Sequence, residues 1–201
     1  MNSDIRELTP EPWAFHLFGF LAPVVVLSGN LAGEWWTASG FILVLGIYPI
    51  LDLLSGEARP ARPPRNSGIP FEIMLWAHAL FHFIVLASLF WRVNADGIML
   101  TTIFACISTR LNSGASAIIT AHELGHKPPK TLGYKLARIL LFSVHYTHFT
   151  YEHNRNHHKW VASDRDPASA SEMMGVWTYF FSTVPKQFFS AVSIMSKKKS
   201  K

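Results

Sequence analysis

The sequence predicts an all-α integral membrane protein: a bundle of about four transmembrane helices with further helices at the cytoplasmic membrane surface. Hydrophobic residues make up 49% of the 201 residues and charged residues only 15%, a balance that is unusual for a soluble globular domain. The formal net charge is +5, but many of the basic residues flank apolar runs, where they act as topology signals. We therefore expect a lipid environment and no nucleic-acid partner.

Four apolar stretches are long enough to be considered as spans, and in chain order they cover about residues 13–29, 35–54, 71–91 and 97–121. A helix needs about 20 apolar residues to cross the hydrocarbon core, with a lower limit of about 17. The strands of a membrane barrel have only about 9–11 residues and alternate polar with apolar side chains. These runs are apolar on all sides, so they are predicted to be helices.

The loop over residues 55–70 sets the predicted orientation. It contains four prolines and three arginines, Arg59, Arg62 and Arg65, and short loops rich in Lys and Arg remain in the cytoplasm. Two predicted spans precede this loop and two follow it. The N-terminus and everything after Ala121 are therefore predicted to face the cytoplasm as well.

The character of the chain changes after Ala121. Residues 132–152 are predicted to form one helix with an apolar and a polar face, lying against the membrane. Residues 172–194 are aromatic but contain Pro185, which we expect to break the helix, so this segment is predicted to be interfacial rather than spanning. We expect residues 1–201 to form a single membrane domain, with a histidine-rich region over 122–170.

Two short histidine motifs stand out in that region. Seven of the ten histidines lie between His122 and His158. In HELGH, His122 and His126 are four residues apart and would project from one face of a helix. In EHNRNHH, His153 and His157 repeat this spacing, and His158 would point about 100° away from its neighbour.

Neutral imidazole is a good ligand for iron, zinc, copper and nickel. Five candidate ligands exceed the three protein ligands of a simple catalytic zinc site, so the two motifs predict two metal ions. Alternatively, these histidines cap helices and donate hydrogen bonds at the interface. Three nearby side chains are candidates to hydrogen-bond to the ligands: Glu123, His148 and Glu152. His148 and Glu152, four residues apart, are expected to bond to each other.

The stretches NSGASAIITAHELGHK and YTHFTYEHNRNHHKWVASDRDPASA resemble the membrane alkane 1-monooxygenases, within the wider membrane desaturase and hydroxylase superfamily. The resemblance implies a helical fold in the bacterial inner membrane, with two non-haem iron ions held mainly by histidine. It implies O2-dependent terminal hydroxylation of medium-chain n-alkanes to 1-alkanols, with electrons from rubredoxin and its NADH-dependent reductase. Carried over by motif, the iron ligands are His122, His126, His153, His157 and His158; no further catalytic residue is implied.

The sequence departs from that family in two ways. Asn156 stands where the family usually has glycine. The family also continues with two more spans, a further histidine motif and a third histidine box, whereas no histidine follows His158 here. The resemblance therefore covers only the N-terminal portion of the family, and we expect this chain to be an incomplete, truncated domain that is inactive alone.

Three other functions fit parts of the pattern. A xylene-type monooxygenase or a fatty-acyl desaturase would use the same histidine motifs on a different substrate. A membrane zinc peptidase would use HELGH as an H-E-x-x-H motif, with Glu123 as the general base, but it leaves the second motif unexplained. A degenerate, non-catalytic relative would bind a metal or a partner without turnover.

Overall fold

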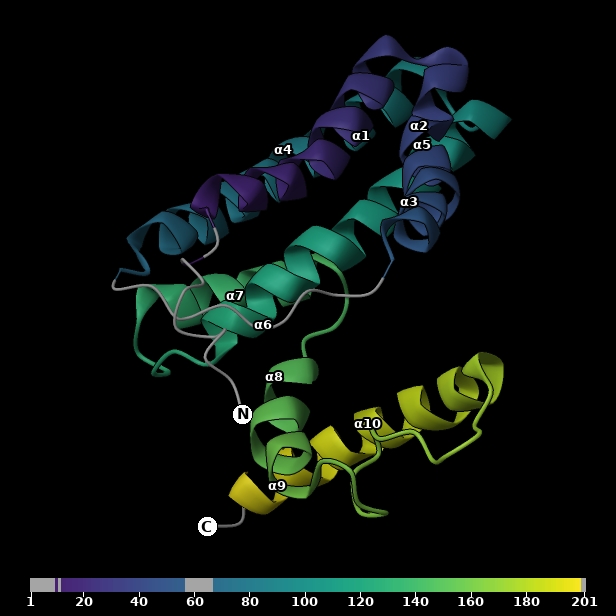
Figure 1. Ribbon diagram of the computed structural model, residues 1–201. Helices are drawn as coiled ribbons and strands as arrows, with labels where there is room; N and C mark the ends of the chain where they lie inside the picture. The colour runs from purple at the N-terminus through teal and green to yellow at the C-terminus, as the bar shows by residue number, and fades with distance from the viewer. Residues whose placement is uncertain (1–9, 11, 57–66, 200–201) are drawn as a thin grey trace. The chain divides into compact units, whose positions relative to one another are not determined.

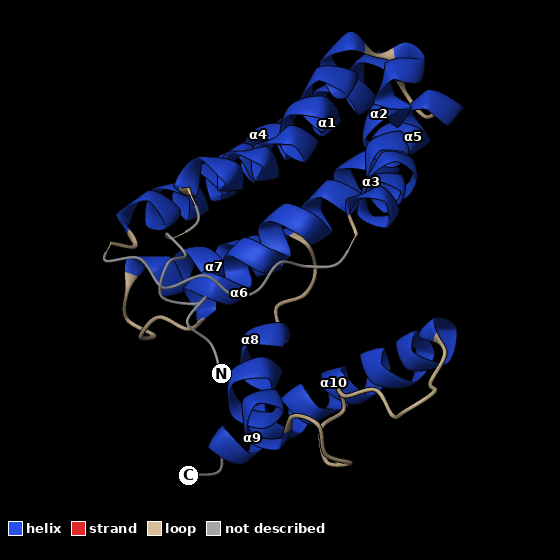
Figure 2. Cartoon of the chain, viewed as in Figure 1, coloured by secondary structure: helices blue, strands red, loops and turns tan. Residues whose placement is uncertain are grey.

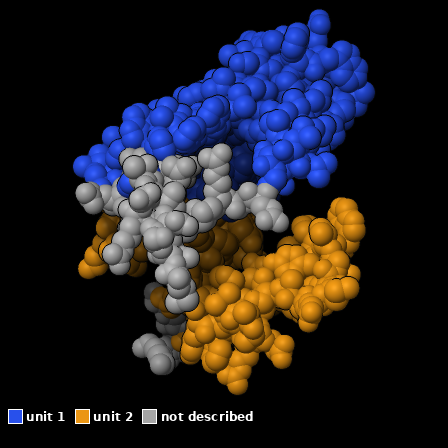
Figure 3. Space-filling model, in the orientation of Figure 1, with its two compact units in different colours: residues 1–120 blue, residues 121–201 orange. Residues whose placement is uncertain are grey.

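The computed structural model describes residues 10, 12–56 and 67–199. Within these ranges every regular element is a helix and none is a strand (Figure 2), which confirms the predicted all-α class. The chain divides into two compact units, residues 1–120 and 121–201 (Figure 3), which are described separately below. That the whole chain forms one domain remains a prediction.

Three helical segments in unit 1 are long and apolar enough to cross a membrane. The first, Trp13–Ala32, consists of η2 (Trp13–Phe20) and α1 (Leu21–Ala32). The second, Glu34–Ser55, consists of η3 (Glu34–Ala38), α2 (Ser39–Ile42), η4 (Leu43–Ile47) and α3 (Tyr48–Ser55). The third is α4 (Ile69–Asp96), which lies along α1 (Figure 1). They confirm helices at the predicted spans 13–29, 35–54 and 71–91.

The segment predicted as the fourth span, residues 97–121, is also helical. It consists of α5 (Leu100–Ser113), a π-helical turn η5 (Gly114–Ile118) and α6 (Ile119–Gly125). It is not among the three described helices that are apolar enough to cross, because its middle carries Arg110, Asn112 and Ser113. Its crossing therefore remains a prediction, and the arginines of the 55–70 loop lie outside the described residues.

Small and polar side chains bring the helices of unit 1 together, as is usual where lipid removes the hydrophobic drive for helix association. Gly40 in α2 faces Val26 and Ser108, and a Cβ at Gly40 would lie 2.8 Å from the Cβ of Ser108. Asn30 donates hydrogen bonds from Nδ2 to Ser88 Oγ at 3.0 Å and to Thr109 Oγ1 at 3.3 Å. One buried amide thus links α1, α4 and α5.

A buried arginine of α4 holds the C-terminal end of α1. The guanidinium of Arg92 donates to the carbonyl oxygens of Asn30 at 2.6 Å and Leu31 at 2.8 Å, and it pairs with Asp96 at 3.0 Å. The last carbonyls of a helix have no partner within the helix and carry partial negative charge. Arg92 satisfies two of them, and Asp96 balances its charge.

His78 in α4 forms a hydrogen bond to a neighbouring helical segment. Its Nδ1 lies 3.1 Å from Ser116 Oγ in η5, and its ring stacks on Phe20 at a centroid distance of 3.9 Å. These contacts connect α4 to η2 and η5. His78 is therefore a packing residue of unit 1.

In unit 2, the helix predicted over 132–152 is wrong in its length. α7 ends at Ser143 (Leu132–Ser143), and α8 (Phe149–Glu152) begins after a turn. His145 has a left-handed φ of 58°, while Tyr146 N–H donates to Leu141 O and His145 N–H donates to Phe142 O. This pair of bonds around a left-handed residue is a Schellman C-cap. The helix ends because His145 adopts the left-handed conformation, at a position that glycine usually occupies.

The predicted break at Pro185 is also wrong. α10 runs without interruption from Val176 to Lys199, with Pro185 inside it, and it packs against α8. Proline removes one N–H donor from a helix, but a single lost bond kinks or weakens a long helix without always ending it. α10 is not among the described helices apolar enough to cross a membrane.

Candidate metal centre

The first histidine motif places two imidazoles side by side. His122 lies in α6 and His126 in the turn that follows it. Their Nε2 atoms are 3.4 Å apart and their ring centroids 4.8 Å apart. The prediction that His122 and His126 project from one face is therefore confirmed.

The second motif differs from the prediction. Residues His153–His157 form a π-helical turn, η6, between α8 and α9 (His158–Trp160). A π turn closes with hydrogen bonds between residues five apart, so it aligns His153 with His158. Their Nε2 atoms lie 3.0 Å apart. The sequence-based prediction concerned only the direction of His158 relative to its neighbour His157, and it did not include this contact between His158 and His153.

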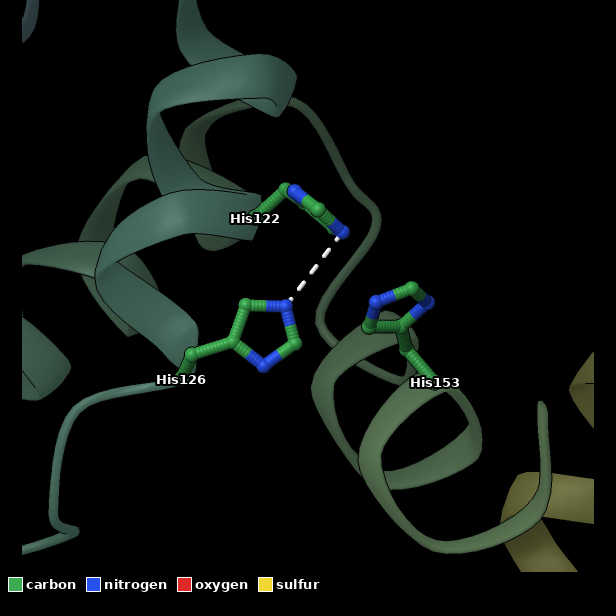
Figure 4. Close-up of side chains that lie close together, drawn as sticks. All are labelled: His122, His126 and His153. Carbon is green, nitrogen blue, oxygen red and sulfur yellow. Dashed lines mark hydrogen bonds between the residues drawn. The ribbon is translucent and has the colours of Figure 1, made fainter. Parts of the chain in front are cut away.

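The two motifs meet. One candidate ligand nitrogen from each of His122, His126 and His153 lies within 4.8 Å of the other two (Figure 4). The ring of His158 completes the group, 4.9 Å from that of His126 and 4.5 Å from that of His153. We call these four side chains the imidazole cluster. Its members come from two segments separated by the 26 residues 127–152 of the chain, yet their rings lie close together.

His157 lies beside the cluster and has a partner of its own. Its ring stacks on that of His153 at 5.2 Å, and its Nδ1 lies 2.8 Å from Asp166 Oδ2. The Asp166 side chain is fully buried. Burial raises the pKa of Asp166, but hydrogen bonds from Ser169, Ala168 and His157 outweigh it and lower the pKa overall. Sequence reasoning missed Asp166; the Asp-Pro that follows the second motif was the available signal.

The cluster favours neutral imidazoles. Burial, followed by the neighbouring histidines His122, His158, His157 and His126, lowers the pKa of His153 to about 3. Burial and the charges of His122 and His158 likewise lower the pKa of His126. A neutral imidazole has one unprotonated nitrogen, which is the form that binds a metal ion. The donor set therefore fits a metal cation.

The three side chains predicted to support the ligands are placed differently from one another. Glu123 Oε1 lies 3.0 Å from His122 Nδ1, as a supporting carboxylate would. Glu152 is buried and accepts a hydrogen bond from Asn156 at 2.8 Å, and burial raises its pKa. The expected side-chain bond between His148 and Glu152 is absent among the described residues, where the two are joined only by the backbone bond from Glu152 N–H to His148 O and where His148 Nε2 has no hydrogen-bond partner.

Asn156 uses the side chain that a glycine would lack. Its Nδ2 donates to Glu152 and, at 3.1 Å, to Ser190 Oγ of α10. The bond to Ser190 ties the second motif to α10. The departure from glycine is compatible with the helix because residue 156 has an ordinary helical conformation.

Comparison with known proteins places these features in a family. The fatty acid desaturase family profile matches residues 98–199. Alkane 1-monooxygenase 1 of Alcanivorax borkumensis is 28% identical over 188 residues, covering 88% of this chain and 45% of that protein. The alkane 1-monooxygenase of Pseudomonas putida is 31% identical, covering 85% of this chain and 44% of that protein.

The alkane 1-monooxygenase of Ectopseudomonas oleovorans is 30% identical, over 80% of this chain and 42% of that protein. The chain thus spans less than half the length of these relatives. The family profile covers the helical segment that leads into the first histidine motif, both motifs and α10. This chain belongs to the fatty acid desaturase family.

Proposed function

We propose that this chain supplies histidine ligands to the non-haem iron centre of an alkane hydroxylase, which oxidises the terminal carbon of medium-chain n-alkanes. One observation carries the proposal: the two histidine motifs, far apart in sequence, bring their ring nitrogens within 4.8 Å of one another. The relatives named alkane 1-monooxygenase support this choice of reaction.

The proposed ligands to two iron ions are His122, His126, His153, His157 and His158. Imidazole suits iron, and five nitrogen donors exceed the needs of one catalytic zinc ion. When bound, the iron would supply the oxidising power, and the protein would supply binding and orientation. The balanced reaction would consume one alkane, one O2, two electrons and two protons, and it would give one 1-alkanol and one water. Five imidazoles leave positions on two irons to be filled by other ligands, and we propose that these are needed for turnover.

The residues of this chain would hold and shield the site. Glu123 and Asp166 lie within hydrogen-bond distance of Nδ1 of His122 and His157, a contact that would fix the ring orientation of a ligand. We propose that the n-alkane substrate enters from the lipid. His126 and His158 border a cavity of about 480 Å³, which gives the imidazole cluster an opening on unit 2. We propose a bacterial inner-membrane location with this face in the cytoplasm and rubredoxin, with its NADH-dependent reductase, as the electron source.

Metal analysis separates this proposal from a zinc peptidase and from a non-catalytic relative. The chain, purified in detergent and loaded anaerobically with Fe²⁺ or Zn²⁺, is analysed for each metal per chain. We expect iron to be retained, and His122→Ala and His153→Ala to lose most of it. His16→Ala is the control, because His16 lies in η2 of unit 1. Retention of a single zinc that survives His153→Ala would refute the proposal.

Substrate comparison separates the members of the superfamily. Membranes containing the protein are supplied with NADH, rubredoxin and its reductase, together with octane, p-xylene or a saturated fatty-acyl substrate. An alkane hydroxylase gives 1-octanol as the main product. Preferential conversion of xylene, or formation of an unsaturated acyl chain, would replace the proposed substrate class while leaving the iron site in place.

A further inference from the structure

The chain folds back after the second histidine motif and places a buried carboxylate against one candidate ligand. Asp166 makes three hydrogen-bond contacts: its Oδ2 lies 2.8 Å from His157 Nδ1 and accepts from Ser169 Oγ at 2.6 Å, and its Oδ1 accepts from Ala168 N–H at 3.0 Å. Its side chain has no exposed surface. Such a carboxylate is costly to bury unless every partner is a donor.

The arrangement restricts which nitrogen of His157 carries the proton. An ionised carboxylate only accepts hydrogen bonds, so the Nδ1 of His157 has to be the donor. In a neutral imidazole the other nitrogen, Nε2, is then unprotonated and available as a metal ligand. The contact therefore selects one of the two tautomers that a free histidine would populate.

The loop that presents Asp166 is itself fixed by α10. Tyr179 Oη donates to Ala168 O at 2.7 Å, and the Thr183 hydroxyl donates to Pro167 O. On the other side of the loop, Ala162 N–H donates to Ser169 Oγ at 2.8 Å. These bonds fix the residues on either side of Asp166 and so hold its carboxylate in position.

We propose that Asp166 is a positioning residue that keeps His157 in its Nδ1–H tautomer and so makes Nε2 its metal-binding nitrogen. The inference rests on the proposed iron site for its purpose, but the tautomer itself is a property of the metal-free protein. Glu123 makes the corresponding contact to His122, but with 54% of its side chain exposed. Water can replace that contact, so Asp166 is the stronger of the two.

Asparagine is an informative replacement because an amide cannot satisfy all three donors. If its oxygen faces His157, its NH2 group meets the N–H of Ala168. If its oxygen faces Ala168, its NH2 group meets Nδ1 of His157, which then has to accept and moves the proton to Nε2. Asp166→Asn therefore changes the tautomer, the loop or both, with almost no change in side-chain volume.

The first test reads the tautomer directly. Long-range ¹H–¹⁵N spectra of ¹⁵N-histidine-labelled, metal-free protein in detergent are recorded about two pH units above the ordinary histidine pKa of about 6.5. His157→Gln identifies the His157 signals. We expect the Nδ1–H tautomer in the wild type, and a mixture or the Nε2–H tautomer in Asp166→Asn and Asp166→Ala. Asp164→Asn is the control, because Asp164 is exposed and two residues away.

The second test measures binding of Co²⁺ alone by its absorption spectrum. Loss of a supporting carboxylate weakens metal binding by about 10–100-fold, and we expect this for Asp166→Asn but not for Asp164→Asn. An unchanged His157 tautomer in both Asp166 variants, with helicity retained, would overturn the inference and leave the iron proposal standing. A tautomer that depends on Asp166 in a wild-type protein that binds neither Co²⁺ nor Fe²⁺ would instead refute the iron site.

Discussion

At the scale of single residues, the imidazole cluster brings together side chains that repel one another when they are protonated. His153 has the most strongly lowered pKa among the cluster members, about 3, because burial and four neighbouring histidines disfavour its charged form. Protonation of His153 in the folded, metal-free protein therefore costs free energy, and this cost matters only when the pH is lowered. A bound cation would be disfavoured by the same protons, since ligands must be deprotonated.

This gives a prediction for stability against pH. The unfolded chain protonates His153 near the ordinary value of about 6.5, whereas the folded chain does so only near 3. Between these values the unfolded state binds more protons, so the free energy of unfolding falls as the pH drops from about 6.5 towards 3. Urea unfolding of the metal-free protein at several pH values measures this, and His153→Gln should flatten the slope. An equal slope in wild type and variant would contradict the role of His153.

At the scale of elements, two departures from the sequence-based prediction have local causes. The helix predicted over 132–152 stops at Ser143 because His145 adopts a left-handed conformation, which hydrophobic periodicity does not register. α10 continues through Pro185 because packing of the rest of the helix outweighs one lost hydrogen bond. The three long apolar helices, by contrast, were predictable because length and composition alone determine them.

The sequence identified the histidines of the candidate site, but it did not predict which of them contact each other. The spacing of His122 and His126 fits any α-helix, so their contact follows from the sequence. The pairing of His153 with His158 depends on a π turn, and no simple sequence signal marks where such a turn forms. Asp166 lies in a loop whose path is set by hydrogen bonds to Tyr179 and Thr183, which are distant in the chain.

The C-cap of α7 predicts a stabilising substitution. Left-handed conformation costs a non-glycine residue roughly 1 kcal/mol, and glycine avoids that cost. His145→Gly should therefore raise the free energy of unfolding by up to about 1 kcal/mol, partly offset by the greater entropy of unfolded glycine. Thermal unfolding followed by tryptophan fluorescence measures it. His145→Ala is the matched control and should bring no gain, because alanine keeps the Cβ.

The close contacts around Gly40 predict a destabilising substitution at this position. A Cβ there would press on Val26 and Ser108, so Gly40→Ala should cost about 1–3 kcal/mol by overpacking. Gly46, in the same span, has open space around it, and a Cβ added there would meet no atom within 4 Å. Gly46→Ala should be neutral or slightly stabilising, because alanine favours the helix by roughly 1 kcal/mol. Equal melting temperatures for the two variants in detergent would show that the contact at Gly40 is unimportant.

At the scale of the whole molecule, the number of times that the chain crosses the bilayer depends on the segment α5–η5–α6. Three described helices are apolar enough, and the α5–η5–α6 segment carries polar residues in its middle. If this segment crosses, the residues before α4 and the residues after α6 lie on the same face of the membrane. If it does not, the histidine motifs lie on the opposite face from the 55–70 loop.

Cysteine labelling decides between these topologies. In a Cys106→Ser background, a single cysteine replaces exposed Ser67, Ala95 or Ser171. With four crossings, a membrane-impermeant maleimide should label positions 67 and 171 only from the cytoplasmic side and position 95 only from the other. Labelling of positions 67 and 171 from opposite sides would show that the α5–η5–α6 segment does not cross.

The π turn at His153–His157 has a consequence for how the second motif tolerates change in length. A π turn accommodates one residue more than the α-helical turn it replaces, so losing that residue would restore the ordinary winding. His158 would then lie four residues after His153, a spacing that an α-helix also places on one face, so loss of one residue between them should keep both rings directed at the first motif. Insertion of one residue into the turn should instead rotate His158 and everything after it by about 100° around the helix axis relative to His153.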